Sequence, residues 1–128
     1  MRLLLDTHIA LWAILDDERL SAKARALIEN SENAIAVSAA AIWEIAIKHA
    51  LARSNMPISG SEALGFFREA GYELVSISAA HAVLVDSLPP HHNDPFDRLM
   101  IVQAKAESAR FVTHDKVAAK YGDHVITV

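Results

Sequence analysis

Short apolar runs without polar interruption recur along this chain and alternate with longer, helix-like segments. Such runs are typical of strands buried on both faces, as in parallel sheets covered by helices. The sequence therefore predicts the α/β class, with helices on both faces of a parallel sheet of about four to five strands. The predicted strands are residues 2–5, 34–37, 73–77, 110–113 and 125–128.

Helix-forming segments fill the intervals, and several follow a residue that favours a helix N-terminus. Ser21 precedes residues 22–30, Ser38 precedes residues 39–52, and Asp94 with Pro95 opens a helix that runs to about residue 108. The other predicted helices are residues 9–15, 62–70, 78–88 and 116–121.

Composition limits the classes of function. The chain has 128 residues, of which 52% are hydrophobic, so we expect one domain over residues 1–128. The absence of cysteine excludes disulfides, thiolate metal sites and thiol nucleophiles. A net charge of −4 argues against holding nucleic acid by bulk positive charge. No apolar run has the length of a membrane span and no cleavage site follows the N-terminal run, so we expect no membrane association and a cytoplasmic location.

Two aspartates follow predicted strands from opposite ends of the sequence. Asp6 ends the strand at residues 2–5, and Asp115 lies shortly after the strand at residues 110–113. Because the carboxyl ends of parallel strands meet at one edge, where α/β proteins bind ligands, we expect both carboxylates at the same crevice. Aspartate is also common in turns and helix caps, which is the alternative explanation for each.

Glu44 interrupts a helix that is apolar on nearly every side. A buried carboxylate is costly unless it is paired, protonated or bound to a metal, so Glu44 is a candidate site residue. The alternative is an exposed stripe on which Glu44 pairs with Lys48, four residues later.

Two further acids lie in the segment HHNDPFDR. We interpret Asp94 mainly as the N-cap of the helix that follows, with Pro95 in its first turn. Asp97 lies in the same turn, where the helix dipole favours an ionised acid, and is free to point into the crevice.

Asp6, Glu44, Asp97 and Asp115 would repel one another at a common edge unless cations or shared protons offset their charge. Oxygen ligands without cysteine suit Mg²⁺ or Mn²⁺. The chemistry that uses such a site is phosphoryl transfer or phosphodiester hydrolysis, in which the ion activates a water.

The chain resembles the PIN-domain proteins, and more narrowly the VapC toxins of bacterial type II toxin–antitoxin modules. The resemblance lies in LLLDTHIALWAILDD, VSAAAIWEIAIK, LPPHHNDPFDRLMIVQA and FVTHDKVAAKYG, in this order. It implies a single PIN-like domain of three α/β/α layers and a Mg²⁺- or Mn²⁺-dependent endoribonuclease that attacks tRNA or rRNA. It also implies a VapB-type antitoxin as partner, a homodimer, and DNA contact only through the antitoxin.

The same resemblance implies roles for individual side chains. Asp6, Glu44, Asp97 and Asp115 correspond to the catalytic, metal-binding acids of the family. Asp94 belongs to the DPFDR form of the motif, and whether it touches the metal is left open.

Hydroxyl and basic side chains complete the predicted site. In the family, hydroxyls such as those of Thr7 and Thr113 often orient the acids or a water, and we predict that both contact substrate together with Arg98. Other basic residues also follow the acids and could line a phosphate path: Lys48, Arg53, Lys105 and Lys116.

Histidine and tryptophan receive structural interpretations. No two histidines have the spacing of a zinc site, although His8 and His114 neighbour site acids and could tune them. Trp12 and Trp43 lie in apolar runs, so we expect them to pack in the core rather than to stack on bases.

Two other kinds of protein compete with the nuclease. A receiver-like signalling domain also binds Mg²⁺ at strand ends, but it requires paired acids after the first strand, where Asp6 stands alone. A non-catalytic PIN-like binding module would not need all four acids.

Overall fold

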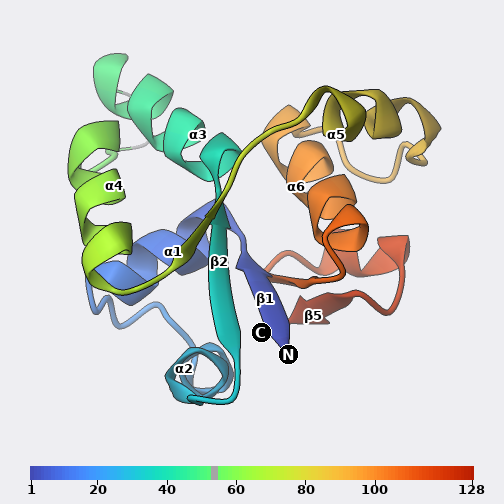
Figure 1. Ribbon diagram of the computed structural model, residues 1–128. Coiled ribbons are helices and arrows are strands. Elements are labelled where there is room, and N and C mark those ends of the chain that lie inside the picture. The colour runs from blue at the N-terminus through green and yellow to red at the C-terminus, as the bar shows by residue number, and fades with distance from the viewer. Residues whose placement is uncertain (53–54) are drawn as a thin grey trace.

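The computed structural model describes residues 1–52 and 55–128, and these residues contain one five-stranded sheet in which every pairing is parallel (Figure 1). The order of the strands across the sheet is β3-β2-β1-β4-β5. The predicted class and strand number are thereby confirmed. The strands are β1 (Arg2–Leu5), β2 (Ala34–Ser38), β3 (Glu73–Val75), β4 (Arg110–Thr113) and β5 (Val125–Thr127).

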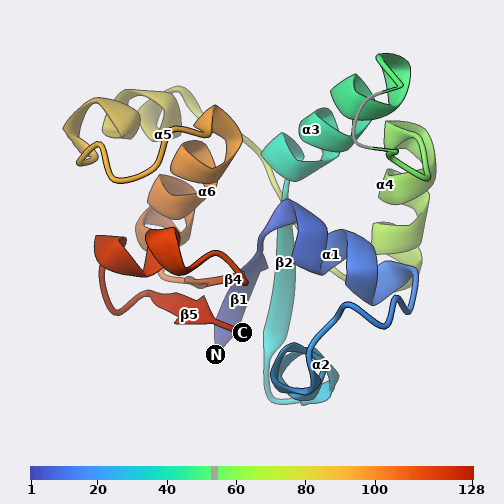
Figure 2. The same cartoon turned by 180° about the vertical axis from the view of Figure 1, so that it is seen from behind.

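Helices occupy the intervals between the strands. Figures 1 and 2 show α1, α3 and α4 gathered on one side of the sheet, and α5 and α6 on the other. The α-helices are α1 (Thr7–Ile14), α2 (Ala22–Glu29), α3 (Ala39–Ala50), α4 (Gly60–Glu69), α5 (Ala79–Leu84) and α6 (Pro95–Ala106). Two 3₁₀ helices follow α5 and β4, η1 (Val85–Ser87) and η2 (Lys116–Tyr121). None of the helices in the described part of the chain has the length and apolarity needed to span a bilayer.

The central strand β1 explains why the predicted strands are continuous apolar runs. Leu3, Leu4 and Leu5 are at most 1% exposed, because helices cover both faces of the strand. Leu4 is paired in register with Ala36 of β2 and with Phe111 of β4. Because Asp6 directly follows this buried strand, the packing of β1 fixes the position of Asp6 at the edge of the sheet.

The strand order excludes the receiver-like alternative. Receiver domains use the order 2-1-3-4-5. In this chain β2 pairs with one edge of β1, and β3 pairs with β2. The chain then crosses back, and β4 pairs with the other edge of β1. Asp6 and Asp115 consequently follow neighbouring strands.

Several element boundaries differ from the sequence prediction. α1 begins at Thr7 rather than at residue 9, because the Asp6 side chain accepts a hydrogen bond from the His8 N–H and caps the helix. The segment at residues 116–121 forms a 3₁₀ helix rather than an α-helix. α6 ends at Ala106, and Ser108 adopts a positive φ of 52° beyond it.

Trp43 is 57% exposed, so the prediction that it packs in the core is wrong. The buried positions of α3 are Ala40, Ala41, Glu44 and Ile45, which form one narrow stripe. Trp43 lies off this stripe, because successive residues of an α-helix point about 100° apart. Trp12, in contrast, packs partly buried against the core.

Close packing between α3 and α4 depends on a glycine. A Cβ on Gly60 would lie 2.7 Å from the Cβ of Ala46, whereas a Cβ on Gly65 would meet no atom within 4 Å. We predict that Gly60→Ala lowers the free energy of unfolding by roughly 1–3 kcal/mol through overpacking. The control Gly65→Ala should raise it by roughly 0.5–1 kcal/mol, because alanine favours helix. Urea unfolding measures both, and equal effects of the two substitutions would contradict the packing argument.

Candidate metal centre

An open hollow of about 510 Å³ lies at the carboxyl ends of β1 and β4. Five acids from four segments of the chain line it, together with histidines and lysines. All five acids predicted for the site are therefore brought together. The lining residues are Asp6, His8, Glu44, Lys48, His92, Asp94, Asp97, His114, Asp115 and Lys116.

Asp6 sits where β1 ends, and its backbone N–H still donates to the carbonyl of Val112 in β4 at 2.9 Å. The Thr113 hydroxyl donates to its carboxylate Oδ2 at 2.5 Å. The residue is only 4% exposed. Burial raises the pKa of Asp6, although the Thr113 hydrogen bond and the nearby His8 and His114 oppose this rise. The Asp6 carboxylate is therefore costly to ionise without a nearby cation.

Glu44 is 3% exposed and points from α3 into the hollow. Its Oε1 accepts a hydrogen bond from the Thr7 hydroxyl at 2.6 Å, and its Oε2 lies 2.6 Å from Nζ of Lys48. The two explanations offered for Glu44 are thus combined, since the carboxylate is both buried and paired with Lys48. Lys48 therefore brings one positive charge to the acidic cluster.

Asp94 caps α6, as predicted. Its Oδ1 accepts hydrogen bonds from the N–H groups of Phe96 at 2.8 Å and Asp97 at 3.1 Å, and Pro95 occupies the first helical position. The cap orients the first turn of α6 so that Asp97 faces the hollow. Asp94 also lines the hollow, so the cap does not remove it from the site.

Asp97 also has a raised pKa. Burial raises its pKa to about 8, and the charges of Asp6, Asp94, Glu44 and Asp115 add to the rise. The hollow also holds five carboxylates against only two lysines, so negative charge remains that the lysines do not offset. The arrangement favours a bound cation for the same reason.

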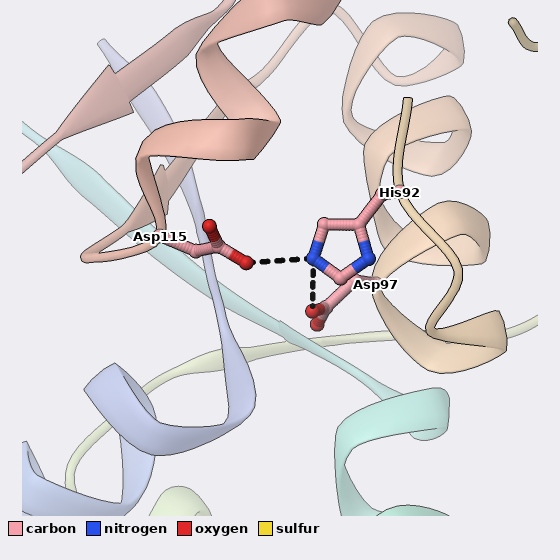
Figure 3. A group of neighbouring side chains, drawn as sticks. All are labelled: His92, Asp97 and Asp115. Atoms are coloured by element: carbon pink, nitrogen blue, oxygen red, sulfur yellow. Dashed lines mark hydrogen bonds and ion pairs between the residues drawn. The ribbon is translucent and has the colours of Figure 1, made fainter. Parts of the chain in front are cut away.

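His92 lies between two of these acids (Figure 3). Its Nε2 is 2.6 Å from Oδ2 of Asp115 and 3.2 Å from Oδ2 of Asp97. The Asp94 N–H donates to Nδ1 at 3.0 Å, so the ring proton resides on Nε2 and is donated to the acids. Burial raises the pKa of Asp115, but hydrogen bonds from the Val117 N–H and His92 outweigh burial and hold this pKa below its usual value.

Sequence reasoning missed His92. The histidine spacing gives no zinc pattern, yet the ligand atoms of His92, Asp97 and Asp115 lie within 4.8 Å of one another and could hold a metal ion. The signal lay in HHNDPFDR, where a histidine stands two residues before the N-cap of α6. Only the fold of the loop before that cap brings His92 to Asp115.

Arg98 lies outside the hollow and supports the loop that carries His92. Its guanidinium donates to the carbonyls of Leu88, Pro89 and His92 at 3.1–3.3 Å. The predicted contact of Arg98 with substrate stays a prediction. Among the other basic residues of the expected phosphate path, Lys48 and Lys116 line the hollow, Lys105 lies in a different cleft, and Arg53 falls outside the described residues.

The two predicted hydroxyls are buried and hold acids in place. Thr7 and Thr113 are both fully buried, and each donates its hydroxyl proton to one carboxylate, Thr7 to Glu44 and Thr113 to Asp6. Thr113 also accepts from the Asp115 N–H at 3.1 Å. Their predicted contact with substrate stays a prediction.

The donor set fits a hard divalent cation. Five carboxylates and three imidazoles surround a hollow that is open to solvent, which suits an ion that keeps some water ligands. Asp6 and Asp97 are the side chains with the most to gain from such an ion, because burial and neighbouring charges disfavour their ionised forms.

Comparison with known proteins identifies the family. A family model described as PIN domain matches residues 3–123. The chain belongs to the PIN-domain family. PIN domains are generally nucleases and generally use divalent metals, which agrees with the acidic hollow and supports a hydrolase role.

Two solved structures share this PIN fold. One is VapBC2 from Rickettsia felis, solved bound to a DNA fragment from its promoter, with 21% identity, a TM-score of 0.70, and coverage of 100% of this chain and 98% of that one. The other is a domain of a functionally unknown protein from Methanocaldococcus jannaschii, with 15% identity, a TM-score of 0.60, and coverage of 99% and 90%. Among curated proteins, a search found no match.

The raised pKa of Asp97 predicts a pH-dependent stability in metal-free protein. The protonated form is favoured in the folded state, so stability from this group is complete at about pH 4 and is lost as the pH rises toward about 8. In EDTA, the free energy of unfolding of Asp97→Asn should equal that of wild type near pH 4. Near pH 8 it should be roughly 2–4 kcal/mol higher than that of wild type. Urea unfolding across this range measures the difference, with the exposed Asp123→Asn as control. A difference that does not change with pH would contradict the assigned electrostatics.

Binding of a divalent ion should relieve the same repulsion. At an Mn²⁺ concentration about 100 times the dissociation constant, the folded state gains about 2.7 kcal/mol, which raises the unfolding temperature by several degrees. We expect Asp97→Asn to lose most of this rise, and Asp123→Asn to retain it. Thermal unfolding with and without Mn²⁺ tests this, and an equal rise in all three proteins would place the ion elsewhere.

Proposed function

We propose that this PIN-domain protein is a metal-dependent endoribonuclease and that it acts as the toxin of a VapBC-type module. The observation that carries the proposal is the convergence of Asp6, Glu44, Asp94, Asp97 and Asp115 on one hollow, with more negative charge than the chain itself offsets. A cluster of this kind suits a site in which a cation binds and a phosphodiester is hydrolysed.

Mg²⁺ or Mn²⁺ is the proposed cofactor. Once bound, the ion would lower the pKa of a water and offset negative charge on phosphate oxygens. Asp6 and Asp97 would hold the ion, with Glu44, Asp115 and Asp94 completing the acidic shell. Thr7 and Thr113 keep Glu44 and Asp6 in their orientations through the buried hydrogen bonds described above. In-line hydrolysis would leave 5′-phosphate and 3′-hydroxyl ends.

RNA is the proposed substrate on the basis of the sequence resemblance to VapC toxins, in which tRNA and rRNA are the targets. Hydrolysis by water does not use the ribose 2′-hydroxyl, so selectivity for RNA must arise from contacts away from the reacting phosphate. Cleavage of cellular RNA would take place in the cytoplasm, in agreement with the sequence-based expectation.

A VapB-type antitoxin is the proposed partner. The fold shared with VapBC2 from Rickettsia felis, a complex solved with promoter DNA, supports this proposal. In this proposal the antitoxin supplies the DNA contacts and the toxin forms a homodimer. Size-exclusion chromatography with light scattering tests the dimer, and co-purification with the product of a neighbouring small gene tests the antitoxin.

Removal of one buried acid should abolish cleavage. We predict that purified wild type cleaves single-stranded RNA in Mn²⁺, that EDTA stops this cleavage, and that Asp6→Asn reduces the rate by roughly 100-fold or more, because the proposed metal shell is incomplete. Asp123→Asn should retain wild-type activity. A gel assay of labelled RNA measures the rates.

Contaminating ribonuclease is the main alternative source of activity. Equal rates for wild type and Asp6→Asn at equal protein concentration would identify a contaminant and would remove the support for catalysis. The same result with normal binding of antitoxin would instead favour a non-catalytic PIN-like module.

A further inference from the structure

An exposed aromatic pair stands on the surface between α3 and α6. Trp43 is 57% exposed, and its ring meets the ring of Phe96 edge-on, with centroids 5.3 Å apart and planes at 75°. The Phe96 contact supports the indole from one side only. More than half of the Trp43 surface is left open to solvent, where it is available to contact a ligand.

The pair lies on the two helices that carry three acids of the hollow. Trp43 immediately precedes Glu44 on α3, and Phe96 immediately precedes Asp97 on α6, and both acids line the hollow. Helices α3 and α6 contact each other, so the two aromatic rings bridge them beside the candidate metal site. A strand that leaves the hollow over the contact between α3 and α6 would carry its neighbouring bases past this pair.

The surface next to Trp43 differs in charge from the hollow. An open groove of about 610 Å³ runs from Trp43 along α3 to the start of α4, past Ile42, Ala46, His49 and Leu64. The described residues that line this groove include no aspartate or glutamate. Phosphates are repelled less here than over the five carboxylates of the hollow.

The chain has no overall excess of positive charge with which to bind a nucleic acid. The net charge is −4. Two lysines line the hollow, and one of them, Lys48, forms an ion pair with Glu44. Stacking of a base on an aromatic ring supplies affinity without positive charge, and it tolerates any base because every base has a π face.

We propose that Trp43 is a substrate-positioning residue that stacks on a base of the single-stranded RNA next to the cleaved phosphodiester, with Phe96 holding the indole in place. This inference rests on the proposed ribonuclease function and adds to it the contact that orients the strand. An apolar segment of a protein partner is the other occupant that the groove would suit, and the experiment distinguishes the two.

Binding to two octamers in EDTA isolates the stacking contribution, because metal removal prevents cleavage. One octamer is oligouridylate, and the other has the same ribose-phosphate backbone without bases. Wild type should prefer the octamer with bases, and Trp43→Ala should bind it roughly 10-fold more weakly, while its affinity for the base-free octamer should not change. Trp43→Phe should lose roughly 3-fold, since a smaller ring remains.

The exposed Phe66 on α4 gives a matched control, because it is 39% exposed and does not line the groove. Phe66→Ala should bind both octamers as wild type does. In Mn²⁺, Trp43→Ala should raise the KM for RNA roughly 10-fold with kcat little changed, because stacking acts before and during the reaction alike. Thermal unfolding confirms that each variant is folded.

The proposal would be wrong if Trp43→Ala bound the octamer with bases as tightly as wild type does and had the same KM for RNA. If that variant instead loses affinity for a co-purifying antitoxin while its RNA binding is unchanged, the face belongs to a protein partner and the proposal is again wrong. A wild type that neither binds nor cleaves RNA would reject the ribonuclease function itself. Normal cleavage by wild type with no effect at Trp43 would reject only the stacking contact.

Discussion

The candidate site depends on carboxylates that the fold holds close together although they repel one another. Asp6 is held at the buried end of β1, and Asp97 by the first turn of a capped helix. The backbone that positions these groups is stabilised by apolar burial elsewhere, chiefly along β1. The fold therefore tolerates an acidic cluster that would be unfavourable by itself.

Neutral and basic neighbours relieve part of this repulsion and leave the rest. Lys48 pairs with Glu44, His92 donates to Asp115 and Asp97, and Thr113 donates to Asp6. Burial nevertheless keeps the pKa of Asp97 at about 8, and the charges of the other four acids of the hollow add to this rise. The negative charge that remains in the hollow favours binding of a cation, and the proposed hydrolysis of RNA requires that cation.

The placement of the acids was predictable from sequence because it follows from topology. Once the strands were recognised as buried and parallel, Asp6 and Asp115 had to share an edge, and Glu44 stood out as a carboxylate in an apolar helix. Capping chemistry likewise located Asp94 at the start of α6. These inferences use local patterns whose physical meaning does not depend on the rest of the chain.

Other features depend on contacts that no local pattern encodes. His92 reaches the acids because Arg98 and Tyr121 bind the backbone of its loop, and neither contact is visible in the residue types alone. Trp43 was predicted to be buried because its neighbours are apolar, yet α3 buries only a narrow stripe that passes through Glu44. The strand order also had to come from the structure.

A crystal structure of the protein grown with Mn²⁺ would test the central claim most directly, because anomalous scattering locates the ion without assumptions about its ligands. The account predicts a manganese peak in the hollow, with carboxylate oxygens of Asp6 and Asp97 in its coordination shell and His92 moved or retained beside it. No peak at millimolar Mn²⁺, or a peak whose ligands include neither carboxylate, would contradict the account.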